Sequence, residues 1–172
     1  MRALVQAGYP AKLVGKAVDE ALDLQPLALK VLCNVIKNEV GLERALAASL
    51  VETLIKLLGN DRPPEVQREA CVTLTLACFD DMAKIIAIQN NGVTRLSALL
   101  STAACEVRAA AMGALMMITT VDAGKRVILS TSATEEAVKA LSERSDVLLL
   151  NSLKLVASIA AHPGNNYQLG LM

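Results

Sequence analysis

Aromatic residues are almost absent from this sequence of 172 residues. They make up 2% of the chain, there is no tryptophan, and Phe79 is the sole phenylalanine. Hydrophobic residues still account for 53%, so the core must be built mainly from leucine, valine, isoleucine and alanine. A domain of this length buries roughly 70% of its unfolded surface, which is enough to fold without disulfides or metals. We therefore expect a single domain with an aliphatic core.

An excess of positive charge is also lacking. Lysine plus arginine and aspartate plus glutamate each number 17, whereas a protein that binds nucleic acid or an anionic membrane needs positive charge to neutralise phosphates. The most apolar run, residues 109–121, is shorter than the roughly 20 residues that cross a bilayer. The start MRALVQAGYP has no apolar region or cleavage site of a secretion signal. The sequence predicts a soluble, cytoplasmic protein with no nucleic-acid partner and no membrane association.

Cysteine and histidine, which often carry catalysis or bind metals, are few. Cys33, Cys71, Cys78 and Cys105 form no C-x-x-C pair, and we interpret them as small core residues in a reducing compartment. His162 is the only histidine, and the Pro and Gly that follow it predict a turn. A histidine without an orienting partner and a pocket is not expected to act as a base, and metal ligation would need further ligands at set spacings.

Nucleotide binding has one weak candidate, the stretch DAGKR from Asp122 to Arg126. It lacks the leading Gly and the following Ser or Thr of a phosphate-binding loop, and no strand precedes it. We interpret it as a turn between helices with solvated Lys125 and Arg126. We therefore expect no cofactor, no metal, no small-molecule substrate and no catalytic activity; a cryptic enzyme is the alternative that the missing site disfavours.

The chain repeats one helical pattern about every 41 residues. EVQREACVTLTLAC, from Glu65 to Cys78, has a near copy in EVRAAAMGALMMIT, from Glu106 to Thr119, with Ala70 matching Ala111. One step in each direction leads to LQPLALKVL, with Ala28 in the same position, and to VLLLNSLKL from Val147, with Asn151 there. Such self-similarity is typical of solenoid proteins, whose repeats bury their apolar faces against neighbouring repeats.

Each copy contains two longer helices, and a third, shorter one is predicted between copies. The first long helices are PAKLVGKAV, SLVETLIKLL, GVTRLSALL and TEEAVKALS, and breaks such as GNDRPPE separate them from the second. The linking segments NEVGLERALAA, DDMAKIIAIQNNG and VDAGKRVILSTS are each long enough for a short helix. A small helix followed by two longer ones at this period is the armadillo arrangement, whereas HEAT repeats have two helices.

The sequence thus predicts an all-α fold, a right-handed superhelical armadillo-type solenoid of about four repeats. We expect a single domain over residues 1–172, with approximate repeats 8–46, 47–90, 91–130 and 131–172. Neither RALVQAG at the start nor NNYQLGLM at the end has the polar character of a capping repeat. We therefore expect the chain to be part of a longer solenoid.

The phrases VRAAAMGALMMIT and NNGVTRLSALL resemble the armadillo repeat family, and this resemblance spans all four copies. It implies a concave groove, formed by the second long helices, that binds extended peptides or partner helices. A narrower resemblance, carried in order by LVGKAVDEALDLQ, GALMMITTVDAGK and LVASIAAHPGNN, is to armadillo proteins of the radial spokes of motile cilia and flagella. It implies a structural, non-enzymatic subunit of the axoneme, a large cytoskeletal assembly. The alternative is a soluble adaptor or chaperone-type regulator that binds client proteins transiently.

The family resemblance also indicates where a partner would bind. In armadillo proteins that import basic nuclear signals, a Trp lies six and an Asn ten residues after the helix valine. Here only Asn34 keeps that pattern and the other positions are mostly apolar, so we do not expect import of basic signals. Apolar contact surfaces favour a permanent assembly. The alternative is that neighbouring segments of the protein itself cover these apolar residues. The predicted partner-binding groove consists of Lys30, Asn34, Val72, Leu76, Gly113, Met117 and Leu153.

Overall fold

The computed structural model describes residues 8–161, and this part of the chain contains eleven helices and no strand. The helices are α2 (Tyr9–Asp19), α3 (Gln25–Val35), α4 (Glu39–Ala47), α5 (Leu50–Lys56), α6 (Pro64–Ala77), α7 (Asp81–Gln89), α8 (Gly92–Leu99), α9 (Cys105–Ile118), α10 (Asp122–Ile128), α11 (Ala133–Ala140) and α12 (Asp146–Ala160). The prediction of an all-α fold is confirmed. His162 lies outside the described residues.

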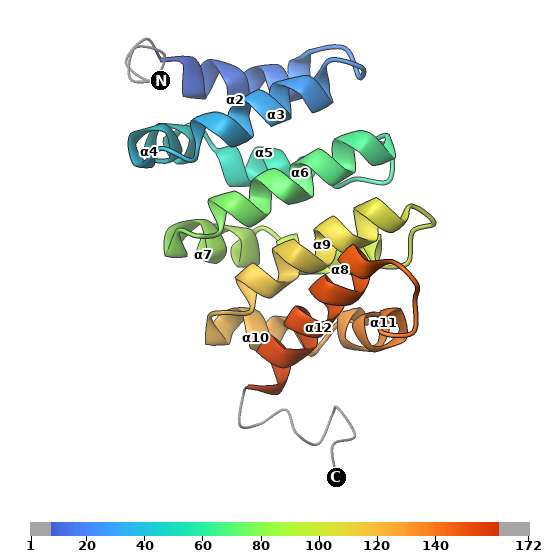
Figure 1. Ribbon diagram of the computed structural model, residues 1–172. Helices are drawn as coiled ribbons and strands as arrows, with labels where there is room; N and C mark the ends of the chain where they lie inside the picture. Colours follow the sequence, from blue (N-terminus) through green and yellow to red (C-terminus); the bar gives the residue numbers. More distant parts are fainter. Residues whose placement is uncertain (1–7, 162–172) are drawn as a thin grey trace.

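The helices form a stack of repeats rather than a bundle (Figure 1). Helices α3, α6, α9 and α12 lie one below another as a ladder, and each packs against the next. Helices α2, α5, α8 and α11 each pack against the ladder helix that follows them in the chain. The short helices α4, α7 and α10 occupy one lateral edge of the stack, on the left in Figure 1. From α4 onward, every repeat therefore has three helices, as predicted. Only the ladder helix of each repeat is long, however, because α4 and α7 have 9 residues each, whereas α5 has 7 and α8 has 8.

Helix boundaries follow the local chemistry of the chain. Pro64 begins α6, where its missing N–H costs no hydrogen bond. Asp80 caps α7, because its carboxylate accepts hydrogen bonds from the N–H groups of Met82 and Ala83 at 2.8 and 3.2 Å. Residues 122–126, which we interpreted as a turn, instead form the first part of α10, the short helix expected in the linking segment VDAGKRVILSTS. The turn interpretation was wrong because an acidic residue such as Asp122 in the first turn favours the start of a helix.

The core is aliphatic, and the small residues of the repeated pattern lie inside it. Ala70 on α6 and Ala111 on α9 are completely buried, as the repeat predicts. Ala28 on α3 is only half-buried, because no preceding repeat packs against α3 within the described residues. Both alanines of the middle repeats therefore belong to the hydrophobic core.

The last repeat is displaced by one residue from the predicted alignment. The repeat alignment matched Val147 with Val107, which is buried, but Val147 is 64% exposed, and Leu148 is buried instead. Likewise, Ser152 rather than Asn151 occupies the position of Ala111. Serine fits there because it is small and its hydroxyl donates a hydrogen bond to the carbonyl oxygen of Leu148 at 2.7 Å.

The small helices approach the ends of the ladder helices closely. A Cβ added to Gly41 on α4 would lie 2.3 Å from the carbonyl oxygen of Val35, and one added to Gly124 on α10 would lie 2.2 Å from that of Ile118. The corresponding residue of α7 is Ala83, so only this small helix leaves room for a methyl group. Glycine at the other two positions allows backbone-to-backbone contact.

Candidate functional site

Two adjoining hollows lie along the ladder and together form a groove. The first, of about 420 Å³, is lined by Arg68, Val72, Cys105, Glu106, Ala109, Ala110, Ser145, Val147 and Asn151. The second, of about 470 Å³, is lined by Cys33, Lys37, Val72, Thr75, Leu76, Phe79, Ala110, Gly113, Met116, Asn151 and Lys154. Both hollows share Val72, Ala110 and Asn151, so the groove is continuous from α3 across α6 and α9 to α12.

Small residues on α9 keep the floor of the groove open. A Cβ added to Gly113 would meet nothing closer than Asn151 Nδ2 at 3.6 Å and Thr75 Oγ1 at 3.8 Å. These are ordinary van der Waals distances, so the glycine does not serve a tight backbone contact. Its missing side chain instead leaves space between α6 and α12, next to Ala110.

Asn151 holds α12, which forms one side of the groove, against α9. Its side-chain nitrogen donates a hydrogen bond to the carbonyl oxygen of Ala109 at 2.8 Å, which ties α12 to the preceding ladder helix. A buried backbone carbonyl that already bonds within its helix still has a lone pair for such a donor. The half-buried Asn151 thus joins two repeats within the groove and does not occupy the buried position of Ala111, with which the repeat alignment matched it.

The rim of the groove carries mostly positive charge. Lys37 and Lys154 line the second hollow, while Arg68 and Glu106 line the first. Lys37 Nζ already donates a hydrogen bond to Asn34 Oδ1 at 2.9 Å. The apolar floor is therefore bordered by three cations and one carboxylate.

A buried carboxylate beside the groove binds two basic side chains. Glu69 on α6 is only 4% exposed, and it forms ion pairs with Arg68 and, at 3.8 Å, with Lys30 of α3. Burial of an unpaired carboxylate would be costly, so these two cations compensate its charge. Lys30, which we predicted as a partner contact, thus joins the first ladder helix to the second.

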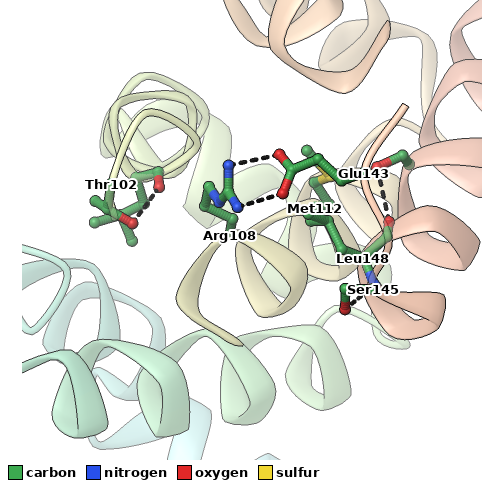
Figure 2. Close-up of polar contacts among 8 residues, drawn as sticks. Thr102, Arg108, Met112, Glu143, Ser145 and Leu148 are labelled. Atoms are coloured by element: carbon green, nitrogen blue, oxygen red, sulfur yellow. Dashed lines mark hydrogen bonds and ion pairs between the residues drawn. The ribbon is translucent and has the colours of Figure 1, made fainter. Parts of the chain in front are cut away.

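A bidentate ion pair holds the last repeat beside the groove (Figure 2). Arg108 on α9 donates to both carboxylate oxygens of Glu143, in the turn before α12, at 2.6 and 2.7 Å. These hydrogen bonds raise the pKa of Arg108 above its ordinary value. Two residues later, Ser145 Oγ accepts a hydrogen bond from the N–H of Leu148 at 3.4 Å and begins α12. This geometry positions the end of α12 that lines the first hollow.

The structure places the seven predicted groove residues in different settings. Val72, Leu76 and Gly113 line the groove. Met117 is half-buried and packs against the core, while Leu153 is 51% exposed and does not line either hollow. Lys30 and Asn34 lie on α3 and bond to Glu69 and Lys37. Whether any of them contacts a partner stays a prediction.

Several groove residues were missed by sequence reasoning. Asn151 and Lys154 of α12 line the second hollow, and the one-residue displacement of the last repeat explains why Leu153 was expected there. Cys33 and Cys105 were expected in the core but are half-buried groove residues. The expected burial is correct for Cys71 and Cys78, and desolvation raises the pKa of the Cys78 thiol to about 12.

Within residues 8–161, no group of three or more histidine, cysteine, aspartate or glutamate side chains has the geometry of a metal site. No helix in this same part of the chain has both the length and the apolar character needed to cross a membrane.

Solved structures show where this architecture has been seen before. No protein-family model and no curated protein matches the chain. A designed armadillo repeat protein, YIII(Dq)4CqI, is 22% identical with a TM-score of 0.89, over 99% of this chain and 73% of that one. Another, solved in complex with the peptide (KR)4, is 22% identical with a TM-score of 0.89, over 99% of this chain and 72% of that one. The predicted armadillo-type solenoid is therefore confirmed.

An engineered protein is also similar, with 27% identity and a TM-score of 0.88. That match covers 97% of this chain but only 41% of the engineered protein. The chain thus spans less than half the length of this neighbour and about three quarters of the designed armadillo proteins.

Proposed function

We propose that this protein is a non-catalytic scaffold whose groove binds an extended segment of another protein. The observation that carries the proposal is the continuous groove over α3, α6, α9 and α12, with an apolar floor left open at Gly113. Concave, mainly apolar surfaces with a few polar groups are typical binding sites. A similar designed armadillo repeat protein was solved with a peptide, (KR)4, and this supports a peptide-like occupant here.

The groove of this chain fits a different kind of peptide. Lys37 and Lys154 on its rim would repel a strongly basic segment such as (KR)4, whereas the charge of Arg68 is paired with Glu69. Val72 and Leu76 on the floor favour apolar side chains. A partner side chain that buries about 150 Å² there contributes up to about 4 kcal/mol at about 25 cal/mol per Å², before association costs reduce it.

We further propose that the scaffold belongs to a stable assembly, the radial spoke of the axoneme in motile cilia and flagella. The resemblance of three ordered sequence segments supports this assignment, and the apolar groove floor suits a permanent subunit contact. The protein would then be made in the cytoplasm and reside in the axoneme. The charged rim of the groove supports the alternative, an adaptor or chaperone-type regulator that binds clients transiently.

The test fills the groove without disturbing the fold. Gly113→Leu places a side chain in the hollow, and because a Cβ meets no atom closer than 3.6 Å, the helix should remain intact or gain stability. Gly15→Leu is the matched control, since this exposed glycine of α2 would place its Cβ no closer than 3.7 Å to Asp19 Oδ2. Both tagged full-length proteins and the wild type are expressed in ciliated cells, and co-purifying proteins are identified by mass spectrometry.

We expect Gly113→Leu to lose a defined set of partners that the wild type and Gly15→Leu retain. Retention of radial spoke subunits through high-salt washing, with tagged protein located along the cilium, would support the axonemal assignment. Clients that wash off, with tagged protein in the cell body, would favour the adaptor. An unchanged set of partners for folded Gly113→Leu would contradict the groove proposal itself.

A further inference from the structure

The exposed large apolar side chains fall into three groups along the stack. One lies on α2, α3 and their connection, at the first end: Tyr9, Leu22, Leu24, Leu27 and Val31. A second lies on α11 and α12, at the other end: Val138, Val147, Leu150 and Leu153. Such end faces are where a solenoid stacks a further repeat. The third group lies in the middle of the array: Val40, Phe79, Met82 and Ile85. Stacking at either end does not explain its exposure.

A hollow lies beside this third group, between α4 and α7. We call it the edge hollow; it has a volume of about 440 Å³. Its apolar lining consists of Leu42 and Leu46 from α4 and Met82 and Ile86 from α7. Met82 is 59% exposed, whereas a side chain of this kind is ordinarily buried. In Figure 1 these two small helices form the lateral edge of the stack, beside the ladder rather than at an end.

The polar lining of the edge hollow is entirely acidic. Its three remaining side chains are Glu39, Glu43 and Asp80, and no lysine or arginine lines it. Asp80 Oδ1 caps α7, but among the described residues Glu39 and Glu43 form no ion pair or hydrogen bond through their side chains.

Three cations belong to α4, to α7 or to the segment before α4, and each already has a partner; one of them, Arg44, follows Glu43 on α4. Lys84 of α7 is buried, and its Nζ lies 2.7 Å from the carboxylate of Asp81. Lys37 donates its hydrogen bond to Asn34 on α3. The edge hollow thus combines an apolar surface with acidic side chains, and none of these cations lines it.

The edge hollow also continues into the groove. A smaller hollow of about 370 Å³ is lined by Ile36 and by two sets of residues, Lys37, Leu76 and Phe79, and Glu39, Leu42 and Asp80. The first set also lines the groove, and the second set also lines the edge hollow. Phe79, 70% exposed in the turn between α6 and α7, stands where the two surfaces meet. The sign of the charge changes there from positive to negative.

We propose that the edge hollow is a second docking surface, which binds a segment of a partner protein with apolar side chains flanked by lysine or arginine. The apolar residues would cover Met82 and Leu42, and the cations would face Glu39 and Glu43. Charge complementarity of this kind selects partners and rejects those of like charge. The acidic rim makes an anionic membrane surface a mismatched occupant. This second surface does not require the groove to be occupied.

The experiment uses three labelled hexapeptides as probes. KKLLKK carries both features, KKSSKK keeps the charge without apolar side chains, and EELLEE keeps the leucines with the opposite charge. Fluorescence anisotropy measures their binding to the wild type and to Glu39→Lys combined with Glu43→Lys. The control, Glu65→Lys combined with Glu135→Lys, makes the same change in net charge at exposed residues of α6 and α11. Circular dichroism confirms that each variant folds.

We expect KKLLKK to bind the wild type more tightly than either other peptide. The variant with lysines at the edge hollow should lose about tenfold in affinity for KKLLKK and gain affinity for EELLEE. The control pair should stay within about twofold of the wild type, because its altered charges lie elsewhere. Gly113→Leu should not change KKLLKK binding, which separates this result from the test of the groove.

Three outcomes would overturn the proposal. Absence of KKLLKK binding to the wild type would remove the site. Equal losses in both double variants would show attraction by net charge alone. Equal binding of KKLLKK and KKSSKK would show that the apolar lining has no role. For the last point, Met82→Ser offers an independent check, since its exposed side chain contributes little to the fold and should weaken KKLLKK binding several-fold.

Discussion

Replacement of Gly124 by alanine places two opposing effects in direct competition. Alanine stabilises a helix interior by up to about 1 kcal/mol relative to glycine. The added Cβ, however, would lie 2.2 Å from the carbonyl oxygen of Ile118, 2.8 Å from its carbonyl carbon and 3.0 Å from its Cγ2. Ordinary contact requires about 3.5 Å, so α10 would have to move by roughly 1 Å.

That movement is costly because α10 packs against both α7 and α8. Overpacking of this kind typically costs about 1 to 3 kcal/mol, and the contacted atoms belong to backbone rather than to a flexible side chain. We therefore expect Gly124→Ala to lower the free energy of unfolding by about 1 to 3 kcal/mol. At about 2 to 4 °C per kcal/mol for a domain of this size, the melting temperature should fall by several degrees.

The control is Gly15→Ala, in the same kind of helix but with open surroundings. Its nearest contact, Asp19 Oδ2, would lie at an ordinary 3.7 Å, so only the gain in helix propensity remains. This variant should be about 0.5 to 1 kcal/mol more stable than the wild type. Urea unfolding followed by circular dichroism compares the two proteins. A Gly124→Ala protein as stable as Gly15→Ala would show that the close approach of α10 to α9 is not a feature of the molecule.

Three further predictions concern the core, a repeat junction and the thiols. Ala111→Leu should cost about 1 to 3 kcal/mol in urea unfolding; an unchanged midpoint would disprove tight packing at this position. A double-mutant cycle on Arg108 and Glu143 should give a coupling of about 0.5 to 1 kcal/mol for this partly exposed pair, and zero coupling would deny its role. Burial raises the pKa of Cys78 from 9.0 to about 12 and that of Cys71 further, so above pH 9 the unfolded state loses these protons first and stability should fall. The loss should shrink when both cysteines are replaced by alanine, and an equal loss would refute this origin.

The repeat period of the sequence predicted the order of the helices, but it did not predict correctly which residues of the last helix are buried. Matching EVQREACVTLTLAC to its copy placed Ala70 and Ala111 correctly, because both lie in the middle of the array. In the last repeat, the similarity of Val147 to Val107 favoured an alignment one residue off. The true buried residues, Leu148 and Ser152, include a polar one whose hydroxyl is satisfied by its own helix. Sequence similarity does not reveal such a hydrogen bond.

The groove was predicted in part for a related reason. Val72, Leu76 and Gly113 follow directly from the repeat, since α6 and α9 are in the expected register. Asn151 and Lys154 do not follow from the repeat, because α12 is displaced by one residue from the predicted alignment. That alignment predicted Leu153 as the groove residue of this helix. The edge hollow was not predicted at all: Leu42 and Met82 come from segments 82 − 42 = 40 residues apart, and only the stacking of α4 beside α7 brings them together.

The polar contacts between repeats also have a mechanical meaning. Side-chain hydrogen bonds gather between the third and fourth repeats, where Asn151 bonds to Ala109 at 2.8 Å and Ser158 to Thr119 at 3.0 Å. Hydrogen bonds are directional and resist sliding, whereas apolar contact has no preferred direction. Bending stiffness should therefore be greatest between α9 and α12. A load that changes the curvature of the stack would be absorbed mainly between α3 and α9, while the last two ladder helices act as a fixed platform.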